Sequence, residues 1–302
     1  MKKEKNDKKE EKKVNEKIKK EEKIEKTEKK EKKEKVKTSN PEQKYGKIKF
    51  AVTVLAIILV LGAIAYVVNT IIEKQNFTAQ NPIATMEIEN YGTVKIELYP
   101  DYAPETVSNF IKLANNGFYD GLTFHRTIPN FMIQGGDPNG DGTGNATLKD
   151  LGLDSDEDYT IKGEFIANGY NDNTLKHERG VISMARGDYS SYSSTLATEG
   201  YNSGSCQFFI TTTDQSSNLD GLYAGFGKVI EGMEIIDNIS NVEVETRDTQ
   251  TDTDSTLTQD KPIDPPVITS IRVDTFGIDY GTPETREPFD LNSWYMSQMY
   301  GY

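Results

Sequence analysis

The feature that most constrains this chain is an uncharged stretch at residues 50–72, FAVTVLAIILVLGAIAYVVNTII. At about 1.5 Å per residue in a helix, it is long enough to cross a hydrocarbon core of ~30 Å. It separates a tail at 1–49 from a long C-terminal remainder. Roughly 200 residues of that remainder suit one folded domain with its own core.

Two other interpretations of the stretch are a cleaved signal peptide and a lipoprotein anchor. A signal peptide has a short basic start and an apolar stretch of only ~7–15 residues. Here the leading segment is far longer, and the apolar run extends past Val68. A lipoprotein anchor needs a cysteine just after the apolar run, but the single cysteine of the chain is Cys206. An uncleaved single-span transmembrane helix at 50–72 is therefore favoured.

The charges on the two sides of the stretch predict its orientation. Three lysines, Lys44, Lys47 and Lys49, precede it, whereas Glu73 and Lys74 balance each other after it. The positive-inside rule then leaves the N-terminus in the cytoplasm and places the folded part outside the cell membrane. The overall formal charge of −13 hides this division, because residues 1–49 carry 21 Lys and only 12 acidic residues.

The Lys/Glu-rich tail has too few apolar residues to form a core. It is expected to be disordered or, alternatively, a solvated and fluctuating helix. Glu and Lys fall four apart at Glu22/Lys26 and Glu25/Lys29, which gives weak helical support. Attachment to anionic lipid or nucleic acid is one function of such a tail, but its mixed charges favour a solvated segment. We predict no nucleic-acid partner.

Period-two alternation marks the start of the folded part. Apolar and charged residues alternate at 86–89 and 94–98 around an Asn-Tyr-Gly break at 90–92, which predicts a β-hairpin. Further short strand-like runs follow at 180–185, 207–212, 224–229 and 267–273. Many short strands with few helices favour a closed antiparallel barrel.

Two helices are predicted within this part. Pro104 suits a first helical turn, and apolar residues follow it at the i, i+3, i+4, i+7 spacing from 107 to 114. Asn116-Gly117 suits the C-terminus of that helix. A second helical pattern appears at 233–239.

Two motif blocks carry the candidate chemistry. The first is FHRTIPNFMIQGGD at 124–137, and the second is SCQFFI at 205–210, followed by LDG at 219–221 and FGKV at 226–229. The first block places one arginine beside aromatic, thioether and amide side chains. It contains no nucleophile paired with a base, no metal-ligand cluster and no phosphate loop. In order and nearly in spacing, the blocks resemble the cyclophilins, the peptidyl-prolyl cis-trans isomerases, over roughly residues 83–280.

The resemblance implies a mainly β fold, an eight-stranded closed antiparallel barrel with a helix over each open end. With the tail at 1–49 and the span at 50–72, this divides the chain into a linker at 73–82, an isomerase domain at 83–280 and a C-terminal tail at 281–302. It implies an enzyme that requires no cofactor and no metal.

Isomerising the peptide bond before proline requires loss of amide resonance but no proton abstraction and no covalent step. A catalyst must hold the proline ring, grip the backbone and favour the twisted amide. One cation aimed at the proline nitrogen supplies the chemistry. The resemblance gives this role to Arg126, and it places His125 and Gln134 beside it as orienting residues.

The resemblance also assigns substrate contacts. The proline ring is expected to meet an apolar set: Phe131, Met132, Phe209 and Leu219. The substrate backbone is expected to meet Gln207, Ala185 and the loop that contains Gly142. Tyr223 stands where many members have a second active-site histidine, and Arg186 where many eukaryotic members have asparagine.

Other groups of residues give only weak evidence for a metal site or a reactive thiol. The run Asp137–Gly142 mimics the first half of a calcium loop, but position twelve is Leu148 where a bidentate Glu is needed. Two histidines and one cysteine make a zinc site improbable. Cys206 is expected to be a buried small residue and not a reactive thiol.

Three stretches are additions to the compact family pattern: a Ser/Tyr/Gly-rich segment at 187–204, an exposed acidic loop at 242–266, and an aromatic tail at 281–302. The leading hypothesis is a monomeric, membrane-anchored isomerase acting on proline-containing unfolded or extracytoplasmic polypeptides. The alternative is a cyclophilin-like module that holds a partner without turnover. An intact arginine and pocket favour the enzyme, since a pure binder need not keep them.

Overall fold

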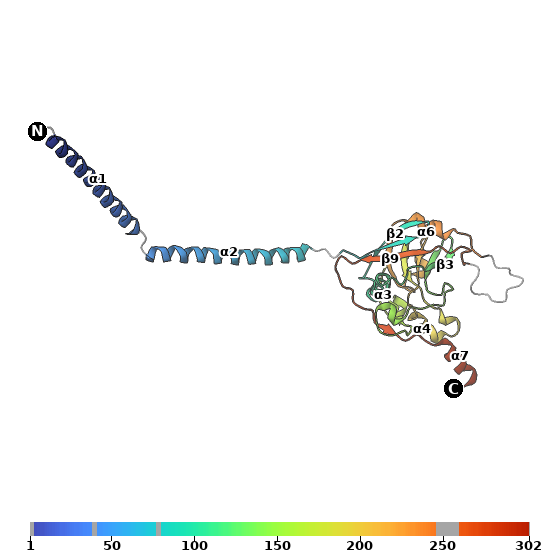
Figure 1. Cartoon of the computed structure of the whole chain (residues 1–302). Coiled ribbons are helices and arrows are strands. Elements are labelled where there is room, and N and C mark those ends of the chain that lie inside the picture. Colours follow the sequence, from blue (N-terminus) through green and yellow to red (C-terminus); the bar gives the residue numbers. More distant parts are fainter. Residues whose placement is uncertain (1–2, 38–40, 77–79, 246–259, 302) are drawn as a thin grey trace. The chain divides into compact units, whose positions relative to one another are not determined.

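The computed structural model describes residues 3–37, 41–76, 80–245 and 260–301, and in the first two ranges it describes the side chains of 16–33 and 45–68. The chain divides into two compact units, Met1–Thr78 and Ala79–Tyr302 (Figure 1). This division falls within the predicted linker at 73–82, of which the middle part, 77–79, lies outside the described residues.

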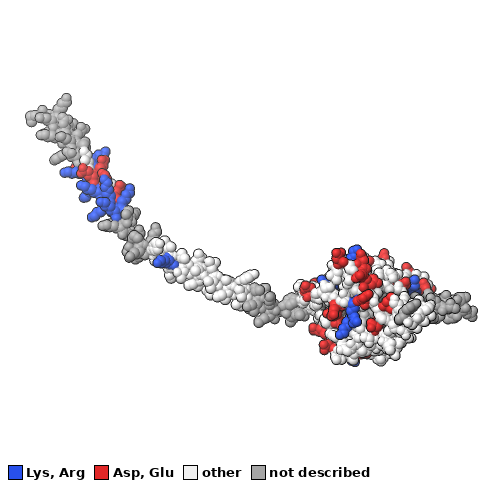
Figure 2. Space-filling model, turned by 90° about the horizontal axis from the view of Figure 1, so that it is seen from below, with Lys and Arg blue, Asp and Glu red and all other residues white. Residues whose placement is uncertain are grey.

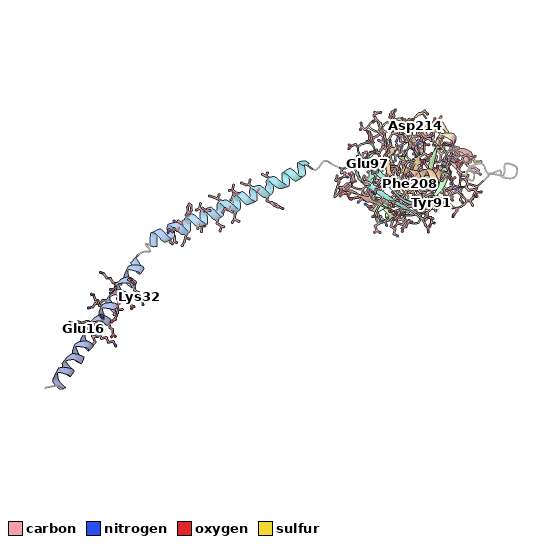
Figure 3. All side chains as sticks on the ribbon, turned by 90° about the horizontal axis from the view of Figure 1, so that it is seen from above. Glu16, Lys32, Tyr91, Glu97, Phe208 and Asp214 are labelled. Atoms are coloured by element: carbon pink, nitrogen blue, oxygen red, sulfur yellow. The ribbon has the colours of Figure 1, made fainter. Side chains whose placement is uncertain are left out.

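The Lys/Glu-rich tail forms helix α1 (Lys3–Lys37). The expectation of a disordered tail is therefore wrong for these residues, which take the alternative of a solvated helix. Lys and Glu are good helix formers, and Lys29 forms an ion pair with Glu25 one turn away. All described side chains of α1 are exposed. Figure 2 shows basic and acidic groups mixed along it, and in Figure 3 Glu16 and Lys32 project from it.

Helix α2 (Pro41–Asn76) contains the uncharged stretch. Within it, Tyr45–Val68 is long and apolar enough to cross a membrane, judged by length and composition. These 24 residues extend over roughly 36 Å at the usual rise per residue. Their side chains are exposed in the isolated chain. The helix begins with Pro41, which suits a first turn because its missing N–H would be unpaired there anyway.

The second unit is built on an eight-stranded antiparallel sheet in the order β3-β4-β7-β6-β8-β2-β1-β9. The eight predicted antiparallel strands are therefore confirmed. Their bounds are β1 (Ile83–Ile88), β2 (Gly92–Leu98), β3 (Thr123–Ile128), β4 (Met132–Asp137), β6 (Val181–Met184), β7 (Phe208–Thr211), β8 (Gly225–Glu231) and β9 (Ile268–Asp274).

The sheet curls until its two edges meet. Thr123 on edge strand β3 bridges Val267, the residue just before edge strand β9. Next to this bridge, the backbone N–H of Phe124 donates to the carbonyl oxygen of Pro266 at 3.0 Å. On the other side of the bridge, the N–H of Gly121 donates to the carbonyl of Ile268 and the N–H of Ile268 donates to the carbonyl of Leu122, both at 2.8 Å. The two edges are thus joined by a short run of backbone hydrogen bonds around the bridge.

Inward-facing side chains of the curled sheet form the main core. Phe110 of helix α3 (Pro104–Asn115) lies in this core, with its ring centroid 5.7 Å from that of Phe208 and 5.2 Å from that of Phe226. All three side chains are fully buried, and Figure 3 labels Phe208 in the interior of this unit. Aromatic rings of this size dominate the apolar area that the core removes from water.

Both predicted helices form. Helix α3 (Pro104–Asn115) packs against β9, and α6 (Met233–Ser240) packs against β2, β3 and β4. The N-terminus of α3 has no cap from its own Ala103. The buried carboxylate of Glu164 caps it from a distance, because it accepts the backbone N–H groups of Glu105 and Thr106 at 3.0 and 2.8 Å. A negative group is favourable there.

Shorter elements complete the unit. They are β5 (Thr160–Ile161) and β10 (Thr285–Arg286), the α-helices α4 (Ala197–Tyr201), α5 (Ser216–Leu219) and α7 (Leu291–Tyr300), and the 3₁₀ helices η1 (Leu148–Leu151), η2 (Ile166–Asn168), η3 (Tyr189–Ser191) and η4 (Ser194–Leu196). Elements η3, η4 and α4 occupy the added segment 187–204. Of the aromatic tail, β10 pairs with β5 and so joins the fold, while the helix α7 has no buried residue.

The predicted acidic loop at 242–266 is described only at its ends, because 246–259 lies outside the described residues. Those ends pair with each other. Val244 bridges Pro262, and the N–H of Glu245 donates to the carbonyl of Lys261 at 2.8 Å. The two described ends of the segment, one following α6 and the other preceding β9, therefore form an antiparallel pair.

Candidate active site

Four neighbouring strands contribute one residue each to a row across the outer face of the sheet. Antiparallel partners run from Arg126 on β3 to Gln134 on β4, then to Phe209 on β7 and Ser183 on β6. The sequence neighbours of Gln134 and Phe209 belong to the main core instead. The site therefore occupies the face of the sheet opposite to the core, as period-two alternation dictates.

A β-bulge turns the arginine onto that face. Strict alternation would put Phe124 and Arg126 on the same side of β3. The pairing register shifts between them, so Phe124 is fully buried in the core while the side chain of Arg126 is 43% exposed. His125 is the intervening residue that takes up the shift, and bulges are commonly used to re-aim a side chain in this way.

A small apolar cluster, separate from the main core, lies on the outer face. Met132, Phe209 and Leu219 form its buried part, and Phe131 and Tyr223 pack against them. The rings of Phe209 and Tyr223 meet edge to face, with centroids 5.5 Å apart. Three different segments (β4, β7 and α5 with its following loop) thus build one apolar pocket.

A cavity of about 110 Å³ opens over this pocket. Eight of the eleven predicted site residues line it: Arg126, Gln134, Phe131, Met132, Phe209, Leu219, Ala185 and Tyr223. Sites for drug-sized ligands are larger, at about 300–1,000 Å³. The cavity therefore suits a single small apolar ring, with the guanidinium groups of Arg126 and Arg186 and the amide of Gln134 among its lining.

A chain of hydrogen bonds leads away from the arginine. Nη1 of Arg126 donates to Oε1 of Gln134 at 3.5 Å, and Nε2 of Gln134 donates to Oε1 of Gln207 at 3.0 Å. Nε2 of Gln207 then donates to the carbonyl oxygens of Gly142 at 3.1 Å and Gly144 at 3.0 Å. Gln207 and Gly142, two further predicted site residues, are therefore connected to the cavity through Gln134.

The loop that carries Gly142 is folded around the carboxylate of Asp137, which is 1% exposed. Backbone N–H groups of Asn139, Asp141, Gly142 and Gly144 all donate to it, at 2.5–3.0 Å. These donors occupy the oxygens that a calcium ion would need. Among the residues that the structure describes, no group of three or more His, Cys, Asp or Glu side chains could hold a metal.

His125, the last predicted site residue, is not among the residues that line the cavity. It is 6% exposed, and neither ring nitrogen has a hydrogen-bond partner in the described part of the chain. Burial lowers its pKa below the ordinary 6.5. The structure thus places it in the bulge, next to Arg126 in sequence, with an uncharged ring; direct contact with substrate stays a prediction.

Comparison with known proteins identifies the architecture. The family model "Cyclophilin type peptidyl-prolyl cis-trans isomerase/CLD" matches residues 83–273. The chain belongs to this cyclophilin family. The structure and the match agree on where the domain begins, since β1 begins at Ile83.

Individual relatives support the same assignment. Peptidyl-prolyl cis-trans isomerase B of Bacillus subtilis is 43% identical over 157 residues, which cover 52% of this chain and 90% of that protein. The isomerase-like 2 protein of Rhizopus delemar is 38% identical over 162 residues, 53% of this chain but only 25% of that longer protein. A Cryptosporidium parvum cyclophilin crystallised in the presence of the dipeptide Ala-Pro matches 64% of this chain and 98% of that chain, with 28% identity and a TM-score of 0.48. The family match and the isomerase names of the Bacillus and Rhizopus relatives support an isomerase enzyme here.

The cyclophilin domain has a second, more polar cavity of about 280 Å³ beside the first. Gln134, Ala185 and Arg186 line both cavities, so the two cavities share a wall. Tyr189 and Ser203 line it from the added segment 187–204. That segment therefore shapes the surface next to the apolar pocket, a role its composition did not predict.

Arg186 has a role that sequence analysis noted only as a departure from the family pattern. Its guanidinium carbon lies 4.4 Å from the ring centroid of Tyr223, 5.0 Å from that of Tyr201 and 5.6 Å from that of Phe165. Nε also donates to the carbonyl of Leu222 at 3.0 Å. Arginine favours such stacking on aromatic faces. The contact joins the added segment to the wall of the apolar pocket.

A buried Ser-His-Asp constellation lies beneath the site. Nδ1 of His177 is 3.0 Å from Oδ1 of Asp220, and Nε2 is 3.1 Å from Oγ of Ser183. A serine nucleophile must reach a substrate carbonyl, but Ser183 is fully buried. The ring of His177 stacks on Phe209 at a centroid distance of 6.4 Å. The constellation therefore supports the floor of the pocket and cannot act as a hydrolase triad.

Asp260 is a further residue that the sequence analysis missed. Its Oδ2 lies 3.2 Å from Nε of Arg126, although 134 positions separate the two residues. The acidic composition of 242–266 was the available signal, but that composition suited a solvated loop equally well. Local patterns hold no information about which distant carboxylate meets the arginine.

Proposed function

We propose that this cyclophilin accelerates cis-trans isomerisation of X-Pro bonds in extracytoplasmic polypeptides, with Arg126 stabilising the twisted amide. The observation that carries the proposal is the placement of the Arg126 guanidinium, held by Gln134, at a cavity of about 110 Å³ built on Met132, Phe209 and Leu219. No other chemistry is needed for this reaction, because no covalent bond forms or breaks.

The roles follow from the geometry. The apolar pocket would hold the proline ring, which fixes one side of the rotating bond. As conjugation breaks, the proline nitrogen gains a lone pair, and the Arg126 guanidinium would donate a hydrogen bond to it. Gln134 orients that guanidinium through Nη1. We assign the substrate backbone to Gln207 and Ala185, as the resemblance to the cyclophilins implies.

The proposed site of action is the outer surface of the cell membrane. Helix α2 provides one candidate span, and the lysines before it favour a cytoplasmic N-terminus. Chains that emerge from the membrane are unfolded and carry a substantial cis fraction at proline, and uncatalysed isomerisation takes ~10–100 s. A monomeric isomerase held there by residues 50–72 would meet these substrates early.

The decisive experiment is the turnover of a proline-containing tetrapeptide in a protease-coupled assay, using the full chain in detergent micelles. Arg126→Ala is expected to lose on the order of 10²-fold in kcat/KM, as when a preorganised transition-state donor is removed. Arg286→Ala, an exposed arginine on β10, is the matched control and should be unaffected. Near-normal turnover by a folded Arg126→Ala variant contradicts the catalytic assignment.

The same assay separates the enzyme from the alternative, a cyclophilin-like module that holds a partner without turnover. That alternative predicts peptide binding by the wild-type chain with no acceleration above the spontaneous rate. The proposed topology needs its own test. Protease added to intact cells should remove the folded domain and spare the Lys-rich tail; a protected domain contradicts the orientation, and a released form lacking 50–72 contradicts the uncleaved anchor.

A further inference from the structure

The contact between Arg126 and Asp260 joins the candidate catalytic cation to a segment added to the family pattern. Nε of Arg126 and Oδ2 of Asp260 are 3.2 Å apart, and the two side chains are 43% and 37% exposed. The carboxylate approaches the Nε edge of the guanidinium, whereas Gln134 occupies Nη1. The guanidinium of Arg126 therefore has hydrogen-bond partners at both Nε and Nη1.

The backbone fixes where Asp260 lies. The N–H of Thr127, the residue after Arg126, donates to the carbonyl oxygen of Asp260 at 2.8 Å. The residues directly after Asp260 pair with residues 243–245 at the other end of the acidic segment. The N–H of Glu245 donates to the carbonyl of Lys261 at 2.8 Å, and the N–H of Ile263 donates to the carbonyl of Glu243 at 3.0 Å. The carboxylate is thus presented by a paired strand-like segment anchored beside β3.

This arrangement matters because an arginine side chain has several rotatable bonds. A partly exposed guanidinium with a single partner samples many positions, and ordering it during the reaction costs conformational entropy. Holding it on the Nε and Nη1 edges in the free protein removes part of that cost. The remaining N–H groups can then face the pocket, whose wall Arg126 forms.

We infer that Asp260 is a positioning residue for Arg126, supplied from a distant part of the chain by the acidic segment at 242–266. The inference rests on the proposed catalytic role of Arg126. Asp260 acts through the arginine and need not touch the substrate. Neutralisation of the cation by Asp260 is a weaker effect, since partly exposed ion pairs at such distances are well screened by water.

The test uses the full chain in detergent micelles and the proline tetrapeptide assay. Asp260→Ala is expected to lower kcat/KM by about 2- to 5-fold, the scale of one partly exposed ion pair, through kcat with KM little changed. Asp260→Asn keeps an acceptor oxygen without the charge and should fall between Asp260→Ala and wild type. Asp264→Ala, an exposed carboxylate of the same segment, is the matched control and should leave turnover unchanged.

Two further measurements distinguish positioning from a general defect of the segment. In an Arg126→Ala background, Asp260→Ala should have no additional effect, because the residue it acts through is absent. The Nε–Hε NMR signal of Arg126, assigned by its loss in Arg126→Lys, should exchange slowly with water in the wild type and quickly in Asp260→Ala. The same signal should be unchanged in Asp264→Ala.

The outcomes separate this inference from the proposed function. If Arg126→Ala retains turnover, the proposed function fails first. If Arg126→Ala loses turnover but Asp260→Ala matches or exceeds the wild type, the positioning role is overturned and the catalytic role stands. An equal loss in both backgrounds, or an Nε–Hε exchange rate that Asp260→Ala does not alter, also overturns it.

Discussion

Gln134 donates a hydrogen bond from its side-chain amide to Oε1 of Gln207, over 3.0 Å. The direction of this bond is fixed by the groups at the two ends of the chain of hydrogen bonds. A guanidinium can only donate and a carbonyl can only accept, so Arg126 donates to Gln134 and Gln207 donates to Gly142. Each glutamine must therefore use its oxygen toward Arg126 and its nitrogen toward the loop.

This polarity makes a testable difference between two acidic substitutions. Gln134→Glu keeps an acceptor for Arg126 but has no donor for Gln207, so turnover should fall by about 2- to 10-fold, the value of one hydrogen bond. Gln298→Glu on the exposed helix α7 is the control and should not affect turnover. The protease-coupled assay measures both, and full activity of Gln134→Glu would show that the bond is dispensable.

Cys206 should be inert in the folded protein. It is fully buried, and burial raises the pKa of its thiol to about 12, which suppresses the reactive thiolate. A thiol-reactive dye should label it only after unfolding in urea. A matched control is the double variant Cys206→Ala with Asn218→Cys, whose new thiol is at an exposed position and should react at once. Rapid labelling of native Cys206 contradicts the prediction.

Stability should fall in mild acid because two histidines are buried. Burial lowers the pKa of both His125 and His177 below the ordinary 6.5. The unfolded chain then binds more protons than the native chain as the pH falls through about 6.5. The free energy of unfolding is therefore intact above that value and decreases below it, down to the lowered native pKa of each ring. A difference of one pKa unit between the native and unfolded states corresponds to about 1.4 kcal/mol.

Urea unfolding at pH 7.5 and pH 5.5, followed by near-ultraviolet circular dichroism, measures this effect. The interval lies above the titration of ordinary carboxylates, but burial raises the pKa of Glu164, so the contribution of a histidine is measured by its substitution. His125→Gln should reduce the difference between the two pH values. Imidazole proton signals of the native protein provide a second measurement if that variant does not fold. Equal unfolding midpoints at the two pH values would contradict the prediction.

The aromatic contacts of Arg186 should stabilise the domain. The guanidinium lies over Tyr223 and Tyr201 at 4.4 and 5.0 Å, and such contacts are worth ~0.5–2 kcal/mol depending on desolvation. Arg186→Ala should lower the free energy of unfolding by about this amount and raise KM for the peptide, because Tyr223 lines the pocket. Arg186→Lys should recover only part of it, since an ammonium does not stack. Unchanged stability and KM in Arg186→Ala would show that the aromatic contacts of Arg186 contribute nothing to stability or to peptide binding.

Regular patterns in the sequence predicted the regular parts of the fold. Alternation at 86–98 predicted the hairpin of β1 and β2, and Pro104 with an apolar face predicted α3. These signals are local, because a strand or helix face repeats within a few residues. The capping of α3 by Glu164 was not predicted, since that carboxylate lies 58 residues from Thr106 in a loop with no periodic pattern.

The part of the site that could be predicted is the set of residues that match the family motifs. Eight motif residues do line one cavity, whereas His125 lies buried in the bulge. The contact of Asp260 with Arg126 could not be predicted, because it depends on backbone pairing between segments that are far apart in the sequence. For the Lys/Glu-rich tail, composition excluded a core but left a disordered chain and a solvated helix both open, because neighbouring charges support a helix only weakly; the structure has the helix.

The bulge at His125 decides on which face of β3 the side chain of Arg126 lies. A shift of one residue in the pairing register moves every following side chain to the other face of the strand. Here the register shifts by one residue between Phe124 and Arg126. If His125 paired with Gln134 and did not bulge, the same letters would place Arg126 opposite Ile133, turn its guanidinium toward the phenylalanine core and leave the pocket without this cation. Comparisons among cyclophilins that consider the motif letters alone do not distinguish the two pairings.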